Sequence, residues 1–168
     1  MGRRQGAMVA GKEKPTEETA DRALVIARVF GVPRQRGFKA WIEQERVTKW
    51  WGPHGFTTPV CELDVRPGGA IHMHMREPDG TVHSMTGVYR EIAEPERLVF
   101  TCVVPDEKGE TLFEVLNTVT FAEQGNKTML TLQARVVKKI AGADRYLAGM
   151  EAGWTQSLER LEAYVAKA

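Results

Sequence analysis

Three histidines in one short stretch of the sequence are the sharpest candidates for metal chemistry. His72 and His74 alternate along a predicted strand, so both rings point to the same side of it. If residues 77–80 form a two-residue hairpin loop, His83 pairs with His74 and lies on that same side. Three imidazoles on adjacent strands could hold zinc, nickel or copper. A shift of one residue in the loop would turn His83 to the other face and break the set. We therefore expect no physiological metal, and His72, His74 and His83 remain the alternative site.

The other side chains that could do chemistry are isolated in the sequence. His54 lies between a predicted helix and a predicted strand, where it could orient a ligand or move a proton. Cys61 shares a strand face with Leu63 and Val65, which is typical of an inert buried thiol. The sequence has no Gly-x-Ser-x-Gly, no phosphate-binding glycine loop and no His-Glu-x-x-His. We therefore assign no catalytic residue, expect no cofactor, and favour a protein that is not an enzyme.

Apolar periodicity and turn residues divide the chain into strands and helices. Residues 24–30 are β-branched and aromatic and predict the first strand, while 33–43 and 44–50 predict two short helices. Turns rich in Gly and Pro then separate six strand-like segments, at 56–65, 69–77, 81–92, 97–104, 111–122 and 127–138. The last helix, with Asp144 as its N-cap, carries one apolar stripe formed by Leu147, Met150, Trp154, Leu158, Leu161 and Val165.

This order of elements predicts an α+β fold. An antiparallel sheet with one wet face must bury its other face, and the last helix offers the large apolar stripe that can cover it. We expect a curved seven-stranded antiparallel sheet wrapped around a long C-terminal helix. The two short helices would lie between strands 1 and 2.

Composition and charge narrow the class of protein. The 168 residues include 23 basic and 22 acidic side chains, which argues against a nucleic-acid partner. No apolar run approaches the ~18–20 residues that span a bilayer, and the start of the chain lacks a secretory signal, so we expect no membrane partner. Two cysteines make no disulfide framework, as in a cytoplasmic protein. Residues 1–19 predict a disordered tail, and residues 20–168 a single domain.

Several stretches of the sequence resemble a known superfamily. They are Trp50-Trp51-Gly52-Pro53, Leu63 to Gly69, Pro78-Asp79-Gly80, Gly87 to Ile92, Pro95 to Thr101 and Gly149 to Trp154. From about Arg22 to its end, the chain resembles the SRPBCC (START-like, helix-grip) superfamily, and within it the activator of heat-shock-protein-90 ATPase homologue-like group. The resemblance implies a helix-grip fold with a deep apolar cavity between sheet and helix. Members include lipid carriers, hormone receptors, polyketide cyclases and co-chaperones, so the fold alone does not decide the function.

Strand alternation indicates which side chains would line such a cavity. Ile71, Met73 and Met75 share one strand face, opposite His72 and His74. Together with the resemblance, this pattern favours a cavity with adaptable Met and Trp walls over a core filled by the same side chains. Trp50 and Trp51 would flank its mouth. The ligand-binding residues that we expect are Trp51, His54, Phe56, Cys61, Ile71, Met73, Met75, Phe113, Val115, Asn117, Met150, Trp154 and Ser157.

We therefore expect the cavity to bind a small hydrophobic or aromatic ligand, oriented by polar groups such as His54, Asn117 or Ser157. Two alternatives stay open. A cyclase- or hydrolase-type enzyme would use His54 or an inward Tyr89 as acid and base in the same cavity. A co-chaperone-like interaction module would bind a partner protein on the outer sheet face. The chaperone link belongs to a two-domain eukaryotic relative, so a chaperone partner is not our first expectation. A homodimer also stays open.

Overall fold

The computed structural model describes residues 23–105, 108, 110–139 and 149–167. The predicted tail over residues 1–19 lies outside these ranges, as do Leu147 and the predicted N-cap Asp144. Strand β1 (Ala23–Phe30) leads into the short helices α2 (Arg34–Ile42) and α3 (Gln44–Val47). Six strands follow, β2 (Thr57–Leu63), β3 (Ala70–Arg76), β4 (Val82–Ala93), β5 (Arg97–Pro105), β6 (Thr111–Gln124) and β7 (Lys127–Lys139). The chain closes with the long helix α5 (Met150–Lys167).

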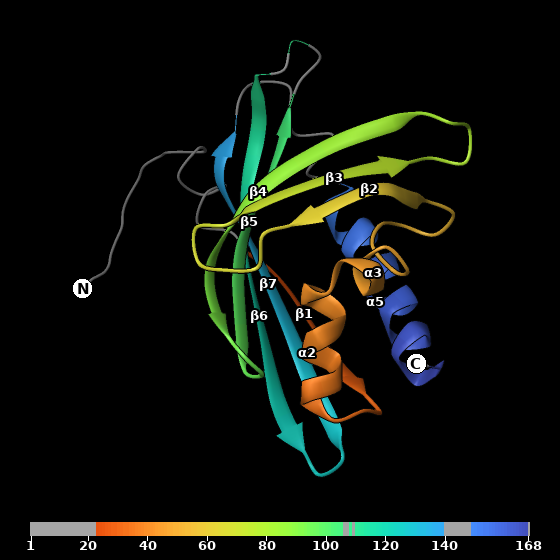
Figure 1. Ribbon diagram of the computed structural model, residues 1–168, viewed down its shortest axis with the longest axis vertical. Helices are drawn as coiled ribbons and strands as arrows, with labels where there is room; N and C mark the ends of the chain where they lie inside the picture. Colours follow the sequence, from red (N-terminus) through yellow and green to blue (C-terminus); the bar gives the residue numbers. More distant parts are fainter. Residues whose placement is uncertain (1–22, 106–107, 109, 140–148, 168) are drawn as a thin grey trace, which may run out of the picture.

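All seven strands form one antiparallel sheet in the order β1-β7-β6-β5-β4-β3-β2. Successive strands from β2 to β7 are neighbours, because short turns join them as hairpins. Register shifts occur within the β2–β3, β4–β5, β5–β6 and β6–β7 pairs, and such bulges bend a sheet. The sheet is curved, and α2, α3 and α5 lie on one side of it (Figure 1). The predicted α+β helix-grip architecture is confirmed.

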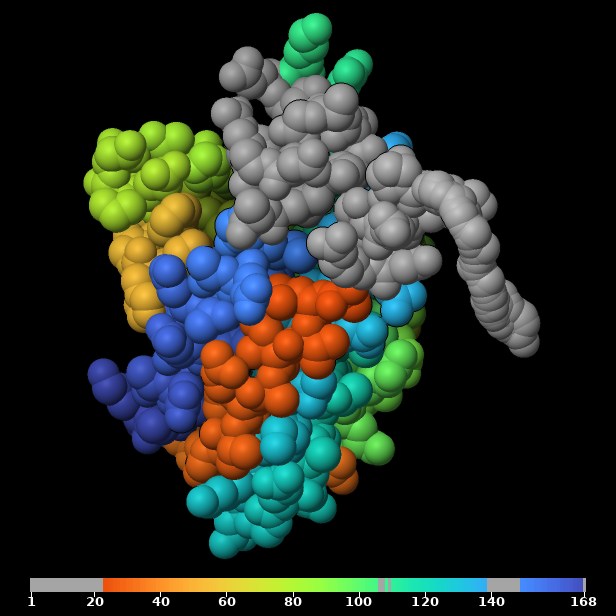
Figure 2. Space-filling model, turned by 180° about the vertical axis from the view of Figure 1, so that it is seen from behind, coloured from red at the N-terminus to blue at the C-terminus, as the bar shows by residue number. Residues whose placement is uncertain are grey.

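Helix α5 is held by the apolar stripe that its sequence predicts. Leu158, Leu161 and Val165 recur at spacings of three and four, and all three are buried against the sheet and the short helices. The helix also contacts β1, and the two elements lie side by side on the face that Figure 2 shows. No helix in the part of the chain that the structure describes has both the length and the apolar character of a membrane span.

Two apolar clusters fill the space between sheet and helices. The larger one is aromatic, and Trp41 lies at its centre, in ring contact with Trp50, Trp51, Phe100, Phe121 and Trp154. The smaller one consists of Leu112, Phe113, Val115, Ala134 and Val136, with the partly buried Leu24, Val104 and Met150 against it. Trp50 is fully buried in the larger cluster and donates from Nε1 to the carbonyl of Ala40 at 2.9 Å. The prediction that Trp50 flanks a cavity mouth is therefore wrong.

Candidate functional site

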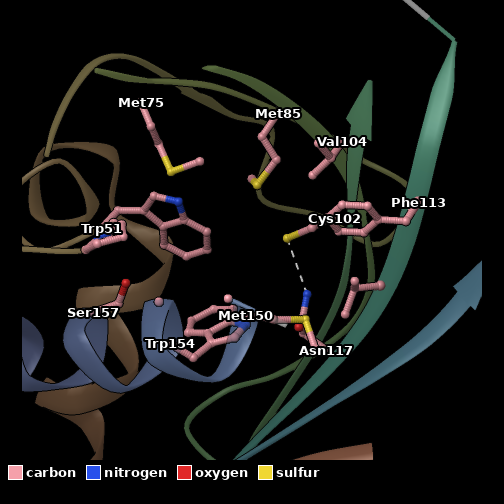
Figure 3. A pocket seen from close by; sticks show the side chains of 15 residues that line it. Trp51, Met75, Met85, Cys102, Val104, Phe113, Asn117, Met150, Trp154 and Ser157 are labelled. Carbon is pink, nitrogen blue, oxygen red and sulfur yellow. Dashed lines mark hydrogen bonds between the residues drawn. The ribbon is translucent and has the colours of Figure 1, made fainter. Parts of the chain in front are cut away.

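A pocket of about 410 Å³ lies between the inner face of the sheet and the N-terminal half of α5. Its walls come from both apolar clusters: the loop after α3, strands β3 to β6, and α5 (Figure 3). The side chains that line it are almost all apolar. The lining residues are Trp51, Gly52, Pro53, Met75, Met85, Cys102, Val104, Phe113, Val115, Asn117, Gly149, Met150, Gly153, Trp154 and Ser157.

The pocket exists because α5 carries small residues where it faces the sheet. Gly149, Gly153 and Ser157 are spaced by four, so they lie on one helix face, and all three line the pocket. A Cβ atom built on Gly153 would have Pro53 Cγ as its nearest neighbour, at 4.0 Å. One turn later, Leu158 and Leu161 fill the corresponding space and are fully buried. The change from small to large side chains along α5 sets where the core ends and the pocket begins.

Two tryptophans form a stiff wall of the pocket. The rings of Trp51 and Trp154 meet edge to face, with centroids 5.4 Å apart. Trp154 also stacks on Trp41 of the underlying core, at 6.0 Å and 24°. Edge-to-face and offset stacked rings are favoured arrangements that restrict side-chain rotation. Met75, Met85 and Met150 contribute flexible thioether walls on other sides, so the pocket combines a rigid aromatic surface with an adaptable one.

The polar groups inside the pocket are few. Asn117 is fully buried on β6, and its Nδ2 donates to Sγ of Cys102 on β5 at 3.3 Å. Burial raises the pKa of the Cys102 thiol to about 12, and the hydrogen bond from Asn117 lowers it in part. The thiol is therefore protonated at neutral pH and is a poor nucleophile.

The loop at the pocket mouth is held by polar contacts to α5. Nη1 of Arg160 lies within hydrogen-bond distance of three main-chain carbonyls, those of Trp51 (3.1 Å), Gly52 (3.0 Å) and Pro53 (3.0 Å). The next residue, His54, is exposed, and its Nε2 lies 2.8 Å from Oε1 of Glu159. Its main-chain N–H group also donates to Gln156 Oε1 at 3.1 Å. Sequence reasoning missed Glu159 and Arg160, because a helix residue can reach a loop a hundred positions away only once the tertiary fold exists.

Comparison with known proteins identifies the family. The sequence profile of the family described as activator of Hsp90 ATPase homolog 1-like protein matches residues 31–166. The chain belongs to this family. A comparison with curated proteins finds no match to the chain.

Solved structures share the family fold. A solution NMR structure of a protein from Arthrobacter aurescens is 22% identical, with a TM-score of 0.77, over 92% of this chain and 91% of that chain. A crystal structure of a protein from Chromobacterium violaceum is 29% identical, with a TM-score of 0.72, over 85% of this chain and 96% of that chain. The AHSA1 protein from Silicibacter pomeroyi is 24% identical, with a TM-score of 0.73, over 86% of this chain and 98% of that chain.

In this member of the Hsp90 activator-like family, the predicted ligand-binding residues fall into two groups. Eight of them line the pocket: Trp51, Met75, Phe113, Val115, Asn117, Met150, Trp154 and Ser157. Five do not: His54, Phe56, Cys61, Ile71 and Met73. The alternation of side chains correctly places Ile71 and Met73 on the inner face, where both are buried. They lie deeper, against Trp41, Trp51 and Tyr89, around a void of only about 10 Å³.

The other predicted residues lie beside the pocket. Cys61 pairs with Met73 and is half-buried in the core, and burial raises its thiol pKa to about 11. Phe56 stacks on the ring of His83, with centroids 6.4 Å apart. Tyr89, the alternative acid and base, is buried under the pocket floor, and desolvation raises its pKa.

Sequence reasoning also missed three lining side chains, Met85, Cys102 and Val104. Met85 pairs with Met73 and Cys102 with Val115, so strand register would have placed both on the inner face. That register is set by the turns and bulges between the strands, and an alternating pattern within one strand does not reveal it.

The hairpin register breaks the histidine set. Glu77 N–H donates to the carbonyl of Thr81, which makes the loop longer than the two residues assumed. His83 consequently pairs with Met75, and Ser84 takes the place beside His74. His83 instead contacts the carboxylate of Glu77. The rings of His72 and His74 remain neighbours, at 4.9 Å. The described residues contain no cluster of three or more side chains that could hold a metal ion.

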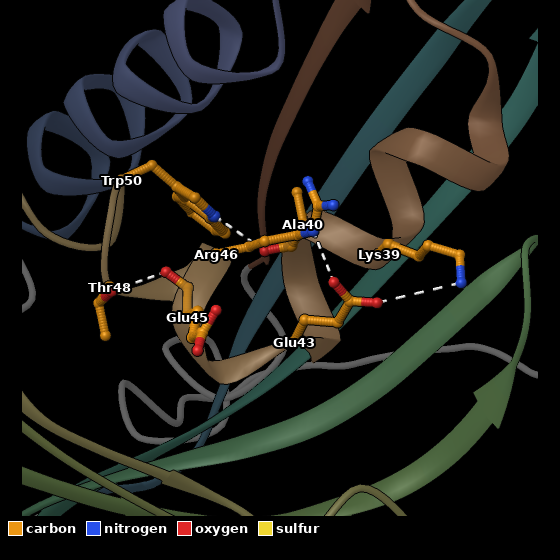
Figure 4. A network of polar contacts seen from close by, with 7 residues as sticks. All are labelled: Lys39, Ala40, Glu43, Glu45, Arg46, Thr48 and Trp50. Atoms are coloured by element: carbon orange, nitrogen blue, oxygen red, sulfur yellow. Dashed lines mark hydrogen bonds and ion pairs between the residues drawn. The ribbon is translucent and has the colours of Figure 1, made fainter. Parts of the chain in front are cut away.

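A second, polar groove runs between α3 and the C-terminal end of α5. It is lined by Glu43, Gln44, Glu45, Arg46, Lys49, Leu63 and Tyr164. Its side chains are occupied with local structure (Figure 4): Glu43 accepts from Arg46 at 2.5 Å, and Thr48 Oγ1 donates to the Glu45 carbonyl at 2.7 Å. Gln44 Oε1 accepts from Leu63 N–H of β2 at 2.8 Å. These contacts fasten α3 to the sheet edge.

Proposed function

We propose that the protein binds a small hydrophobic or aromatic molecule in the pocket between α5 and the sheet. The observation that carries this proposal is the apolar cavity of about 410 Å³, which is within the usual ~300–1,000 Å³ of ligand pockets. Burial of apolar ligand surface contributes roughly 25 cal/mol per Å², and ordering costs offset part of it. The paired Trp51 and Trp154 rings suit a flat aromatic partner, because stacked and edge-to-face contacts add to area burial.

The enzyme alternative draws less support. An acid–base mechanism needs titratable groups that face the bound substrate. Among the described residues that line the pocket, Cys102 is the one titratable side chain, and burial raises its pKa to about 12. His54 is paired with a carboxylate, but both side chains are more than half exposed, on the outside of the loop.

The interaction-module alternative calls for a large exposed apolar patch. The exposed large hydrophobic residues of the described chain are spread over several elements. They are Val25 and Val29 on β1, Val65 after β2, Val82 on β4 and Val137 on β7. Scattered exposed valines are ordinary for a protein surface. A cytoplasmic location, the absence of a nucleic-acid partner and the oligomeric state stay predictions from the sequence.

Titration with N-phenyl-1-naphthylamine, an uncharged dye that fluoresces in apolar surroundings, tests the proposal. We expect saturable binding of one dye per chain with a blue-shifted emission. Val115→Phe places a larger ring in the pocket and is expected to weaken dye binding at least tenfold. Val137→Phe is the matched control, because it makes the same change on β7 at a side chain that is 48% exposed. Equal dye binding by the two variants, or no binding by the native protein, would contradict the proposal.

A further inference from the structure

Asn117 is a polar side chain in the middle of an apolar surface. It lies on β6 between Val115 and Val119, and it pairs with Phe100 on β5 and Ala134 on β7. These neighbours are buried, and Asn117 itself has no solvent-exposed surface. The residue also stands at the boundary of the two apolar clusters, where the pocket opens. An amide in such a place costs free energy unless its hydrogen bonds are made.

Only half of the Asn117 amide is satisfied within the described residues. Nδ2 donates to Cys102 Sγ at 3.3 Å, whereas Oδ1 is buried and has no hydrogen-bond partner. The neighbouring strands cannot supply a donor, because the main-chain N–H groups of β5 and β7 are used in the sheet ladders on either side. Figure 3 shows the amide nitrogen turned to Cys102 and the oxygen turned toward Met150 and α5, across the pocket. An unpaired acceptor therefore borders an otherwise apolar cavity.

We propose that the ligand carries one hydrogen-bond donor, such as a ring hydroxyl, which binds Oδ1 of Asn117 while the rest of the molecule fills the apolar pocket. This inference rests on the proposed function and names the class of ligand. A neutral phenol or alcohol fits, because the described lining holds no charged side chain to pair with an ion. A site built with a buried acceptor discriminates against an analogue that lacks the donor, since the acceptor then stays unpaired. Asn117 is accordingly a specificity residue, and the aromatic walls supply most of the affinity.

Equilibrium dialysis with two probes of the same shape tests this inference. 2-Naphthol carries the donor, and 2-methylnaphthalene replaces the hydroxyl by a methyl group. The measured quantity is the ratio of the two dissociation constants, compared between the native protein and Asn117→Leu. The comparison removes the difference in hydrophobicity between the probes. We expect the preference for 2-naphthol to fall about 5- to 30-fold in Asn117→Leu, as the loss of one buried hydrogen bond predicts. Thr118→Val, on the same strand and the opposite face, keeps the native preference.

Further arms separate the explanations. Asn117→Val suits a strand flanked by Val115 and Val119, so it replaces Asn117→Leu if that variant does not fold. 2-Cyanonaphthalene, which only accepts hydrogen bonds, should show no dependence on Asn117. A preference for this probe that is lost in the variants would overturn the assignment of Oδ1 to the pocket. Unchanged ratios in all proteins would mean that water satisfies Oδ1, which overturns the inference and leaves the proposed function intact. Failure of all three probes to bind the native protein would overturn both.

Discussion

The guanidinium of Arg160 is hydrogen-bonded to the main-chain carbonyl of Trp51, at 3.1 Å. The same nitrogen reaches the next two carbonyls, so one side chain of α5 holds the loop that carries a wall of the pocket. Partial burial lowers the pKa of Arg160, but a guanidinium stays charged at any ordinary pH. The contact ties the long helix to the pocket mouth, across more than a hundred positions of sequence.

Removing this contact is expected to loosen both the fold and the pocket. Arg160→Met keeps the apolar stem and loses the donors, so three carbonyls lose their charged partner. Hydrogen bonds to charged groups contribute about 1.5–3 kcal/mol, and we expect the free energy of unfolding in urea to fall by an amount in that range. Binding of N-phenyl-1-naphthylamine should weaken as Trp51 becomes less ordered. Arg36→Met, an exposed change on α2, serves as the control, and equal stabilities of the two variants would refute the role of Arg160.

The two cysteines should be unreactive in the native protein. Burial raises the pKa of Cys61 to about 11 and that of Cys102 to about 12, from an ordinary value of 9.0. Thiolate is the species that reacts, so iodoacetamide at pH 7.5 should leave both thiols unmodified by mass spectrometry. The unfolded chain in guanidinium chloride should be alkylated twice. Rapid modification of either cysteine in the native protein would show that its surroundings are not apolar.

The same pKa shifts predict a loss of stability at alkaline pH. Because both thiols hold their protons more tightly when folded, their contribution is complete below the unfolded pKa of about 9 and is lost as the pH rises toward 11 to 12. The unfolding free energy should therefore fall between about pH 9 and pH 11. The double variant Cys61→Ala, Cys102→Ala should show a shallower fall in urea titrations at successive pH values. An identical slope in the variant would assign the effect to other groups.

Gly87 on β4 is required by close packing of two strands. A Cβ atom at this position would lie 1.9 Å from the carbonyl oxygen of Thr101, a contact with main chain that no rotamer relieves. Gly87→Ala should therefore force β4 and β5 apart and lower the unfolding free energy by more than about 2 kcal/mol. Gly31→Ala is the matched control, because nothing lies within 4 Å of its Cβ position. Similar unfolding midpoints for the two variants would contradict the close approach of the strands.

Gly153 offers the opposite outcome. It lies within α5, and an added Cβ would meet only Pro53 Cγ, at 4.0 Å, which is an ordinary contact. Alanine in place of glycine inside a helix stabilises it by roughly 0.8–1 kcal/mol. Gly153→Ala should raise the thermal midpoint and narrow the pocket by one methyl group, with a small loss of dye affinity. A lower midpoint would mean that α5 approaches the loop more closely than these distances indicate.

Much of the fold follows from patterns that are local in the sequence. The stripe of Leu158, Leu161 and Val165 predicts α5 because its spacing is helical, and each lies on the buried face. The alternation of Ile71, Met73 and Met75 with histidines predicts which face of β3 is inside. Turn residues such as Gly80 and Gly125, both with positive φ, mark the hairpins that make neighbouring strands antiparallel.

The site was harder to predict, because it depends on distances between elements. Nothing in the sequence says that Met73 lies on the floor and Met75 in the pocket wall, since both point inward. One residue of hairpin register decided that His83 lies beside Met75 and not beside His74. The links from Arg160 and Glu159 to the loop after α3 join parts of the chain that meet only in the folded protein.

The sequence by itself determined the element order, the inward faces and an interior rich in Met and Trp. These properties depend on side-chain periodicity, which is written into neighbouring residues. Tertiary structure decided that small residues on α5 leave a pocket beside the core, and that Asn117 reaches it with an unpaired oxygen. A cavity and an unsatisfied acceptor are both defined by what is missing around a group. Only the packing of distant elements can leave a space empty or an atom without a partner.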